Sequence, residues 1–335
     1  MVSSASGGTR RTSRRSTPEK PNRVPSRRRR EPRLRDLFRT RNAAMRNVLE
    51  TVEKVLDHDV SILILGESGT GKNYLAEAIH ACSARRDEPF VHIECASIPS
   101  ELFESELFGH ERGTFTDAAS RKIGKLEAAG RGTVYFDEIP ALTPQLQAKL
   151  LRAMQERRFS RLGGTAMLPF EARVISSSNA NLPDLLSSDQ LRRDLYYRIN
   201  VVTLTLPPLR ERAEDIPFLA AQFAKRTKLR RFDDDAQRML ANYDWPGNVR
   251  ELRNAIERAA LLEDGDRITA ASLPIREPND LVTTAARGAW TLDQLESQYI
   301  RAVLKTTRRN YSKAAEILGI NRKTLLEKRK KYGLE

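Results

Sequence analysis

Residues 60–73, VSILILGESGTGKN, decide the fold of this chain. The apolar run at 60–65 has the length of a buried strand, and Gly66-Glu-Ser-Gly-Thr-Gly-Lys72 follows it at the start of a predicted helix over 72–82. A strand, a glycine-rich turn and a helix in this order predict a phosphate-binding loop, because backbone N–H groups and the helix dipole then face phosphate oxygens. A coincidental glycine-rich turn is the less favoured alternative. The predicted nucleotide contacts are Gly66, Glu67, Ser68, Gly69, Thr70, Gly71, Lys72 and Asn73.

A second apolar segment, Thr133-Val-Tyr-Phe-Asp137-Glu138, ends in two carboxylates. Beside a phosphate-binding loop, we expect Asp137 to hold Mg²⁺ and Glu138 to polarise the water that attacks ATP. Because Asn73 stands where a Ser or Thr usually follows the lysine, the magnesium contact there must come through water or another residue. Asn179 follows a further predicted strand over 172–176, where it is expected either to sense the γ-phosphate or to cap the next turn.

Predicted strands alternate with predicted helices across this part of the chain. The strands lie at 60–65, 90–93, 133–136, 172–176 and 201–206, and the clearest helices at 45–56, 72–82 and 144–157. This rhythm predicts an α/β fold with a largely parallel sheet and helices on both faces. After Pro207-Pro208 only helical patterns remain, at 216–226, 233–242 and 249–263, which indicates a small all-helical subdomain.

The composition excludes several classes of protein. The chain has 335 residues, of which 39% are hydrophobic and 30% charged, as in soluble multidomain proteins. No uncharged apolar run approaches the roughly 20 residues that span a bilayer, so we predict no membrane segment. The only cysteines, Cys82 and Cys95, exclude a disulfide-stapled scaffold and favour a reducing compartment.

The net charge of +14 is concentrated at the two ends of the chain. Residues 1–41 carry +11 and residues 304–335 carry +7, so the remainder is mildly acidic at −4. Two basic ends predict a polyanionic partner. Residues 1–38 are rich in Arg, Ser and Pro, which predicts a disordered basic tail. A solvated tail is favoured there over a specific nucleic-acid arm.

The last block is predicted to contain three helices, at 292–305, 312–318 and 322–331, after a linker at 276–290. Gly319 separates the last two helices, which indicates a helix-turn-helix; an ordinary basic hairpin is the alternative. The second helix of such a unit enters the major groove with its N-terminal residues at the base edges. The predicted base contacts are Asn321, Arg322, Lys323 and Thr324, and Lys328 begins a cluster predicted to hold phosphates.

Five motifs occur along the chain in the same order as in a known protein family. They are GESGTGK, LFGHERGTFTDA (107–118), GTVYFDEI (132–139), LRRDLYYRINV (191–201) and WPGNVREL (245–252). The chain resembles the AAA+ domain of bacterial enhancer-binding proteins, the sigma-54-dependent transcription activators. Its end resembles their Fis-type helix-turn-helix. The resemblance implies a basic tail (1–38), an ATPase core (39–208), a helical lid (209–275), a linker (276–290) and a DNA-binding domain (291–335).

The resemblance also implies a mechanism and partners. The domain is expected to use ATP and Mg²⁺ and to assemble as a homo-oligomer, from dimer to hexamer. Arg192 and Arg198 match the arginines that reach the γ-phosphate of a neighbouring subunit, and Arg250 matches the sensor arginine of the lid. The expected partners are double-stranded DNA at upstream activating sites and sigma-54 RNA polymerase holoenzyme. The expected location is the cytoplasm, at the nucleoid.

Two positions depart from the family pattern. The loop that contacts sigma-54 usually has the sequence GAFTGA, but here Phe115 and Thr116 are followed by Asp117 in place of glycine. The alternative function is therefore an ATP-binding, DNA-binding regulator that no longer engages sigma-54. The second departure is Glu94, which stands where the family has an asparagine that pairs with the catalytic glutamate, and its charge is expected to repel Glu138.

Overall fold

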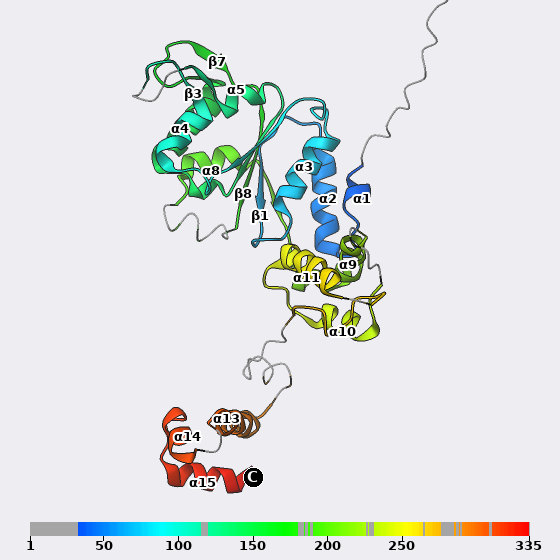
Figure 1. The fold of residues 1–335 in the computed structure, drawn as a ribbon. Coiled ribbons are helices and arrows are strands. Elements are labelled where there is room, and N and C mark those ends of the chain that lie inside the picture. Colours follow the sequence, from blue (N-terminus) through cyan, green and yellow to red (C-terminus); the bar gives the residue numbers. More distant parts are fainter. Residues whose placement is uncertain are drawn as a thin grey trace, which may run out of the picture.

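Five parallel strands form the central sheet of the protein (Figure 1), in the order β2-β5-β8-β1-β9. Every ladder in this sheet is parallel, which confirms the predicted α/β fold class. The computed structural model describes residues 33–114, 120–179, 190–225, 231–263, 265–275, 290–307 and 310–334, together with positions 184, 187, 227, 285 and 288. The strands are β1 (Ile62–Leu65), β2 (Phe90–Glu94), β5 (Thr133–Asp137), β8 (Arg173–Ser178) and β9 (Val202–Thr205).

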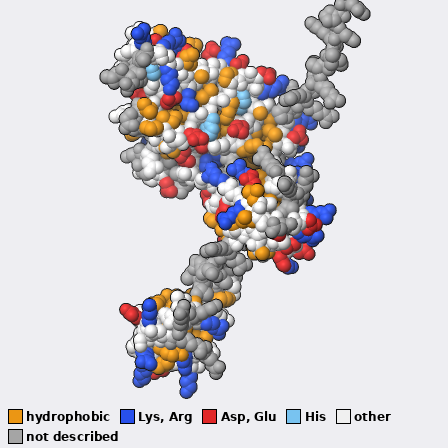
Figure 2. Space-filling model, in the orientation of Figure 1, with side chains coloured by type: hydrophobic (Ala, Val, Ile, Leu, Met, Phe, Trp, Pro, Cys, Tyr) orange, Lys and Arg blue, Asp and Glu red, His pale blue; other side chains and the backbone are white. Residues whose placement is uncertain are grey.

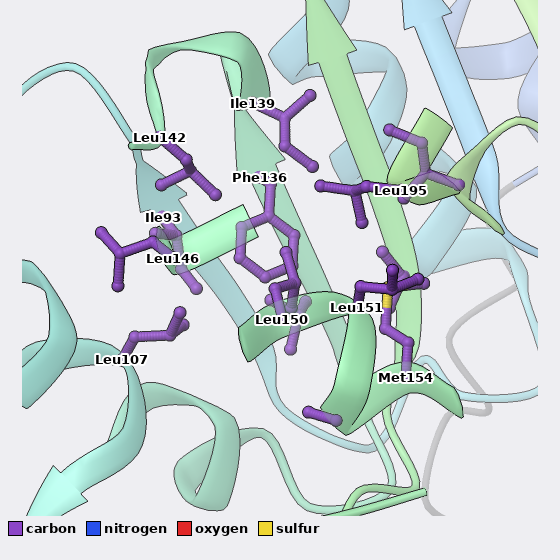
Figure 3. Packing of buried hydrophobic residues seen from close by; sticks show 14 of the residues in the cluster. Ile93, Leu107, Phe136, Ile139, Leu142, Leu146, Leu150, Leu151, Met154 and Leu195 are labelled. Atoms are coloured by element: carbon purple, nitrogen blue, oxygen red, sulfur yellow. The ribbon is translucent and has the colours of Figure 1, made fainter. Parts of the chain in front are cut away.

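Helices cover both faces of this sheet. Successive residues of β1 point to opposite faces, so Ile62 and Ile64 pack into one hydrophobic core and Leu63 and Leu65 into the other. Figure 3 shows the second core, in which Phe136 meets helix residues such as Leu150. The first face is covered by α2 (Ala43–Val55) and α3 (Lys72–Cys82), and the second by α4 (Ser100–Phe108), α5 (Lys125–Ala129), α6 (Pro144–Glu156) and α8 (Arg193–Ile199).

A small helical unit follows the sheet and has its own core. Trp245 is fully buried at its centre, and its indole N–H donates to the backbone oxygen of Leu240 at 2.9 Å. The unit consists of η2 (Leu209–Asp215), α9 (Ile216–Ala224), α10 (Asp234–Asn242) and α11 (Asn248–Leu262). These helices match the predicted all-helical subdomain.

In the described residues 290–307 and 310–334, three helices occur where the sequence predicts them. Ala314 and Ala315 are buried against Leu325 and Ile300, so small side chains lie where two helices cross. Gly319 has a φ of +64°, which glycine adopts without a steric penalty, and this turns the chain between the last two helices. The helices are α13 (Leu292–Thr306), α14 (Tyr311–Ile317) and α15 (Arg322–Lys331).

Several elements differ from the sequence prediction. Residues 34–37, assigned above to the disordered tail, form the short helix α1 (Leu34–Leu37), and Leu34 is buried against the first core. The rest of the tail and most of the linker at 276–290 lie outside the described residues. No helix in the described ranges combines the length and apolar character that crossing a membrane requires. The short strands β3 (Gly109–His110), β4 (Lys122–Ile123), β6 (Arg158–Ser160) and β7 (Met167–Pro169) have no periodic signal that identifies them in the sequence.

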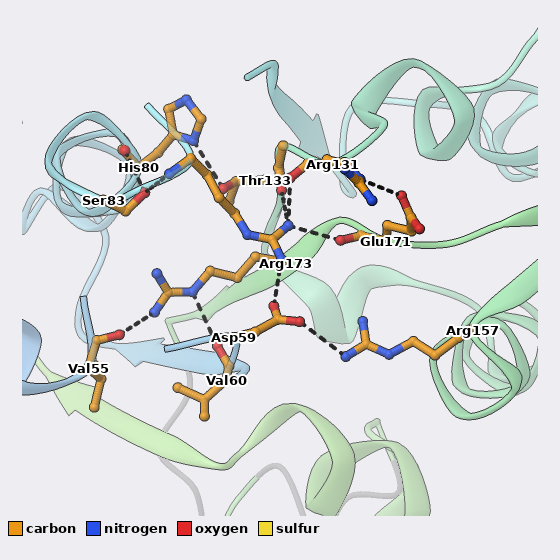
Figure 4. A network of polar contacts seen from close by, with 12 residues as sticks. Val55, Asp59, Val60, His80, Ser83, Arg131, Thr133, Arg157, Glu171 and Arg173 are labelled. Atoms are coloured by element: carbon orange, nitrogen blue, oxygen red, sulfur yellow. Dashed lines mark hydrogen bonds and ion pairs between the residues drawn. The ribbon is translucent and has the colours of Figure 1, made fainter. Parts of the chain in front are cut away.

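A buried arginine ties α2 to the sheet. The Arg173 guanidinium on β8 donates to the backbone oxygens of Val55 at 2.8 Å and Val60 at 3.3 Å (Figure 4). It also donates to the Leu56 oxygen at 2.7 Å. Carbonyl groups at the C-terminus of a helix have no partner within the helix, and Arg173 supplies a charged donor to them; the Val55 oxygen also accepts from the His58 N–H at 3.2 Å. Burial lowers the pKa of Arg173 from its ordinary value, and the nearby Asp59 carboxylate partly opposes this.

We predict that Arg173→Met destabilises the α/β core by about 3 kcal/mol, because the buried carbonyls lose a charged donor. The matched control is Arg131→Met, since Arg131 is largely exposed in its ion pair with Glu171 and such pairs contribute little. Urea denaturation of both variants measures the difference. Equal midpoints for the two variants would contradict the capping role.

Candidate functional site

The phosphate loop joins β1 to α3 through a backbone that glycine permits. Gly71 has a φ of +106° and directly precedes α3, so the first N–H groups of the helix open toward the loop. Gly69 has a φ of +80°, and a Cβ placed there would lie only 2.3 Å from the backbone oxygen of Gly247. The loop therefore touches the helical unit at a position where only glycine fits.

Lys72 lies inside the loop, as the sequence predicts. Its Nζ donates to the backbone oxygens of Gly66 at 2.7 Å and Glu67 at 3.2 Å, and the side chain is almost fully buried. Burial lowers the pKa of Lys72, while the negative charges of Glu138 and Asp137 oppose that shift. The ammonium group is thus held at the loop.

A pocket of about 540 Å³ opens beside the loop. Most of the predicted residues line it: Ser68, Gly69, Thr70, Gly71, Lys72, Asn73, Asp137, Glu138 and Arg250. The pocket is also lined by Leu37, Phe38, Leu219 and Phe223, whose apolar surfaces suit an aromatic base. Leu37 and Phe38 are missing from the predicted site because the predicted tail extends to residue 38, although Leu34, Leu37 and Phe38 have helical spacing. No local pattern in the sequence places Leu219 and Phe223 of α9 at this site.

Asp137 is surrounded by hydrogen-bond donors. Its Oδ1 accepts from the Ser177 hydroxyl at 2.6 Å and lies 3.0 Å from the Tyr135 hydroxyl, and its Oδ2 accepts from Asn73 Nδ2 at 3.0 Å. His92 Nε2 lies 3.7 Å from Oδ2. Burial alone raises the pKa of Asp137, but the nearby His92 and the hydrogen bonds from Ser177 and Asn73 hold the pKa well below its ordinary value. Asp137 is therefore an ionised carboxylate at the phosphate loop.

Glu138 has the left-handed backbone conformation, with φ +60° and ψ +56°. Its N–H donates to the Ser177 hydroxyl at 3.1 Å, and its side chain accepts from the backbone N–H of Asn179 at 2.9 Å. Such strain is held in place by neighbouring contacts and is common at active sites. Asn179 thus contacts the Glu138 carboxylate through its backbone N–H. Glu94, which we expected to face Glu138, accepts from the Ser97 hydroxyl at 2.9 Å.

The helical unit is fastened to the phosphate loop by several polar contacts. Asn248 is fully buried, and its Nδ2 donates to Glu67 Oε2 and to the Ser68 backbone oxygen, each at 3.1 Å. Its Oδ1 accepts from the Leu209 N–H at 2.7 Å. Arg210 forms a two-pronged ion pair with Glu67, at 2.6 and 2.9 Å. Glu67 therefore contacts the helical unit, and neither it nor Gly66 lines the pocket.

Besides Arg210, the arginines Arg212 and Arg250 of the helical unit reach the loop. Arg250 donates to the Ser68 hydroxyl at 2.9 Å, and its backbone N–H donates to the Gly69 oxygen at 3.2 Å. Arg212 is buried, donates to the Thr70 oxygen at 2.8 Å and lines the pocket. No spacing signal identifies Arg212 in the sequence, whereas the WPGNVREL motif identifies Arg250.

Arg192 and Arg198 lie away from this pocket. Arg192 pairs with Asp194 at 2.7 Å beside the start of α8. Arg198 donates to the Met154 oxygen at 3.0 Å and borders a small cavity with residues 59–61, at the opposite end of β1 from the loop. Neither side chain lines the nucleotide pocket of its own chain. The predicted loop residues Phe115, Thr116 and Asp117 lie outside the described residues.

The C-terminal helices present basic side chains (Figure 2). Arg322 and Lys323 are exposed at the start of α15. Asn321 caps this helix, since its Oδ1 accepts from the Thr324 N–H at 2.8 Å and from the Thr324 hydroxyl at 3.0 Å. Lys328 donates to Glu296 of α13 at 2.6 Å, so in this structure it joins two helices. Asn321, Arg322 and Lys323 are exposed, whereas Thr324 and Lys328 are partly buried.

This fold and site define an AAA+ nucleotide-binding domain with a helical lid, followed by a helix-turn-helix. Family comparison matches residues 38–205 to the sigma-54 interaction domain, 210–286 to the AAA+ ATPase lid domain and 291–332 to the bacterial regulatory protein Fis family. The chain belongs to the sigma-54 activator family.

Named relatives agree with this assignment. The transcriptional regulatory protein ZraR of Salmonella typhimurium is 44% identical over 85% of this chain and 66% of its own length. The alginate biosynthesis regulator AlgB of Pseudomonas syringae is 43% identical over 90% of this chain and 68% of its own length. The chain thus spans slightly less than two thirds of ZraR. NtrX of Brucella abortus, solved also with ATP and with ADP, is 36% identical with a TM-score of 0.67, over 90% of this chain and 70% of NtrX.

We predict that Asn248→Ala loosens the lid more than Arg210→Met does. Asn248 is buried with a φ of +54°, which asparagine tolerates better than alanine, and its loss leaves the Leu209 N–H unpaired. The Arg210–Glu67 pair is partly exposed, and such pairs contribute at most about 1 kcal/mol.

Hydrogen–deuterium exchange of α11 in the nucleotide-free protein measures this difference. Faster exchange in Asn248→Ala than in Arg210→Met is the expected result. The reverse order would show that the ion pair holds the lid.

Proposed function

We propose that the protein is a sigma-54-dependent transcriptional activator that binds ATP with Mg²⁺ and hydrolyses it to remodel RNA polymerase holoenzyme. The observation that carries this proposal is the meeting of Lys72, Asp137, Glu138 and the lid residue Arg250 at one pocket. A phosphate loop, two strand-terminal acids and a lid arginine supply charge stabilisation and a base for phosphoryl transfer to water.

Each residue has a distinct role in the proposed reaction. Lys72 and the loop N–H groups bind the β- and γ-phosphates, and Arg250 links the bound phosphates to the lid. Glu138, held by the Asn179 N–H, accepts a proton from the attacking water. Mg²⁺ takes oxygen ligands, which the Asp137 carboxylate offers, and it neutralises phosphate charge.

Hydrolysis is proposed to require a neighbouring subunit. Arg192 and Arg198 are exposed and distant from the nucleotide pocket of their own chain, as expected for arginines that act across an interface. We therefore propose a homo-oligomer, from dimer to hexamer, in which these arginines stabilise charge at the γ-phosphate of the next subunit.

The helix-turn-helix in residues 291–335 is proposed to bind upstream activating sites in double-stranded DNA. Arg322 and Lys323 lead the base contacts from α15, with Asn321 and Thr324 beside them. The other proposed units are the ATPase core at 39–208, the lid at 209–275, the linker at 276–290 and the basic tail at 1–38. The proposed site of action is the cytoplasm, at the nucleoid.

Asp117 favours one alternative. Aspartate at a loop position that is glycine in the family pattern adds a negative charge per subunit close to promoter DNA and loses the freedom to adopt positive φ. In this alternative the protein binds ATP and DNA but no longer engages sigma-54. Phe115 and Thr116 are retained, so the activator function remains the main proposal.

The proposed ATPase predicts different defects for two variants. Lys72→Ala removes the phosphate charge and is expected to lower ATP affinity at least 100-fold. Glu138→Gln retains binding and is expected to lower the turnover rate at least 100-fold, as loss of a general base does. Calorimetry and phosphate release measure the two effects. Wild-type protein without ATP affinity at millimolar Mg²⁺ would overturn the proposal.

The proposed DNA interface predicts that Arg322→Ala weakens discrimination between specific and non-specific DNA by about 1–3 kcal/mol. Lys328→Ala is the comparison, because Lys328 pairs with Glu296 and its loss is expected mainly to loosen the packing of α13 on α15. Competition binding at fixed salt measures the ratio of affinities. An unchanged ratio in Arg322→Ala would remove Arg322 from the base contacts.

A further inference from the structure

Asn73, Tyr135 and Asp137 form a closed triangle of side chains at the end of β5. The Tyr135 hydroxyl lies 2.9 Å from Asn73 Oδ1 and 3.0 Å from Asp137 Oδ1. Asn73 Nδ2 completes the triangle by donating to Asp137 Oδ2 at 3.0 Å. Asn73 comes from the first turn of α3, so the triangle joins the phosphate loop to the acidic strand.

The orientation of the Asn73 amide is fixed by its neighbours. If the amide were turned over, its oxygen would face Asp137 Oδ2 at 3.0 Å, and two acceptors would oppose each other. The hydroxyl of Tyr135, whose ring is fully buried, has one proton and two acceptors within reach, Asn73 Oδ1 and Asp137 Oδ1; an oxygen at the Asn73 position gives it an acceptor and so supports the observed orientation. With Ser177 on the other carboxylate oxygen, both oxygens of Asp137 already have donors.

We propose that Asn73 and Tyr135 form a latch on Asp137, which competes for the carboxylate with the Mg²⁺ that arrives with ATP. This inference rests on the proposed ATPase function. The Asn73 amide nitrogen occupies one lone pair of the carboxylate and cannot itself bind Mg²⁺, which requires oxygen ligands. Binding of Mg²⁺ to Asp137 Oδ2 is therefore weakened as long as the amide donates there, and Tyr135 resists movement of the amide. Asn73 and Tyr135 are positioning residues in this scheme.

The latch lowers the part of the ATP affinity that depends on the metal. Lys72 and the loop N–H groups bind phosphate without passing through Asp137, so the metal-free affinity reports on the loop alone. The effect of the latch is measured by the ratio of the ATP affinity with Mg²⁺ to the ATP affinity without Mg²⁺. A change in phosphate binding by the loop alters both affinities equally and therefore cancels in this ratio. Opening the latch is expected to raise this ratio.

The experiment measures ATP affinity of the full chain by calorimetry, in millimolar Mg²⁺ and in EDTA. Tyr135→Phe removes one hydroxyl and keeps the ring that packs 5.1 Å from His92, whereas Asn73→Ala removes the amide. Each variant is expected to raise the affinity ratio about 3- to 10-fold, which corresponds to the net free energy of one hydrogen bond. The double variant is expected to match the single variants, because both open the same latch. Tyr299→Phe on α13 makes the same chemical change outside the site and is the control.

The outcomes separate the latch from the function on which it rests. ATP binding with an unchanged ratio in Tyr135→Phe and Asn73→Ala overturns the latch and leaves the ATPase proposal intact. A lower ratio in either variant also overturns it, because the side chain then supports the metal instead of opposing it. Wild-type protein that binds no ATP under either condition overturns the proposed function and the latch together.

Discussion

The close approach of the Gly69 backbone to the helical lid is the contact on which the rest of the site depends. The Gly69 oxygen accepts from the Arg250 N–H, and a side chain at Gly69 would collide with Gly247. The phosphate loop and the lid therefore share a backbone surface. Asn248 and Glu67 secure the same surface through side chains. The hydrogen bond between the Gly69 oxygen and the Arg250 N–H thus joins the loop directly to the first turn of α11.

The acidic end of β5 depends on the neighbouring strand. Ser177 of β8 donates to Asp137 and accepts from the Glu138 N–H, so one hydroxyl positions both acids. The left-handed conformation of Glu138 is maintained by this contact and by the Asn179 N–H. Parallel pairing of β5 with β8 thus brings Ser177 beside both the proposed metal ligand and the proposed base.

Local patterns in the sequence identify most of the fold but only part of the site. The run at 60–65, the loop that follows it and α15 are predicted well, because strand length, glycine spacing and capping are local properties. The contacts of Glu67 with Arg210 and Asn248 join residues more than 140 positions apart, so no local pattern indicates them.

Asn73 illustrates the same limit within the site itself. Its position after the lysine is visible in the sequence, but its pairing with Tyr135 and Asp137 depends on how α3 lies against β5. For Lys328, the basic cluster at 328–331 suggests DNA phosphates, whereas the packing of α13 on α15 supplies Glu296 as a partner. The sequence shows that residues 328–331 are positively charged, but only the fold shows that Glu296 neutralises the charge of Lys328.

The central claim is that ATP hydrolysis at this loop drives the protein's action on sigma-54 RNA polymerase. Open-complex formation on a sigma-54 promoter, followed by permanganate footprinting, tests it most directly. The account predicts that the wild-type chain opens the promoter with ATP but not with a non-hydrolysable analogue. No opening by wild type at full ATPase rate, with opening restored in Asp117→Gly, would contradict it and support a regulator that acts without sigma-54.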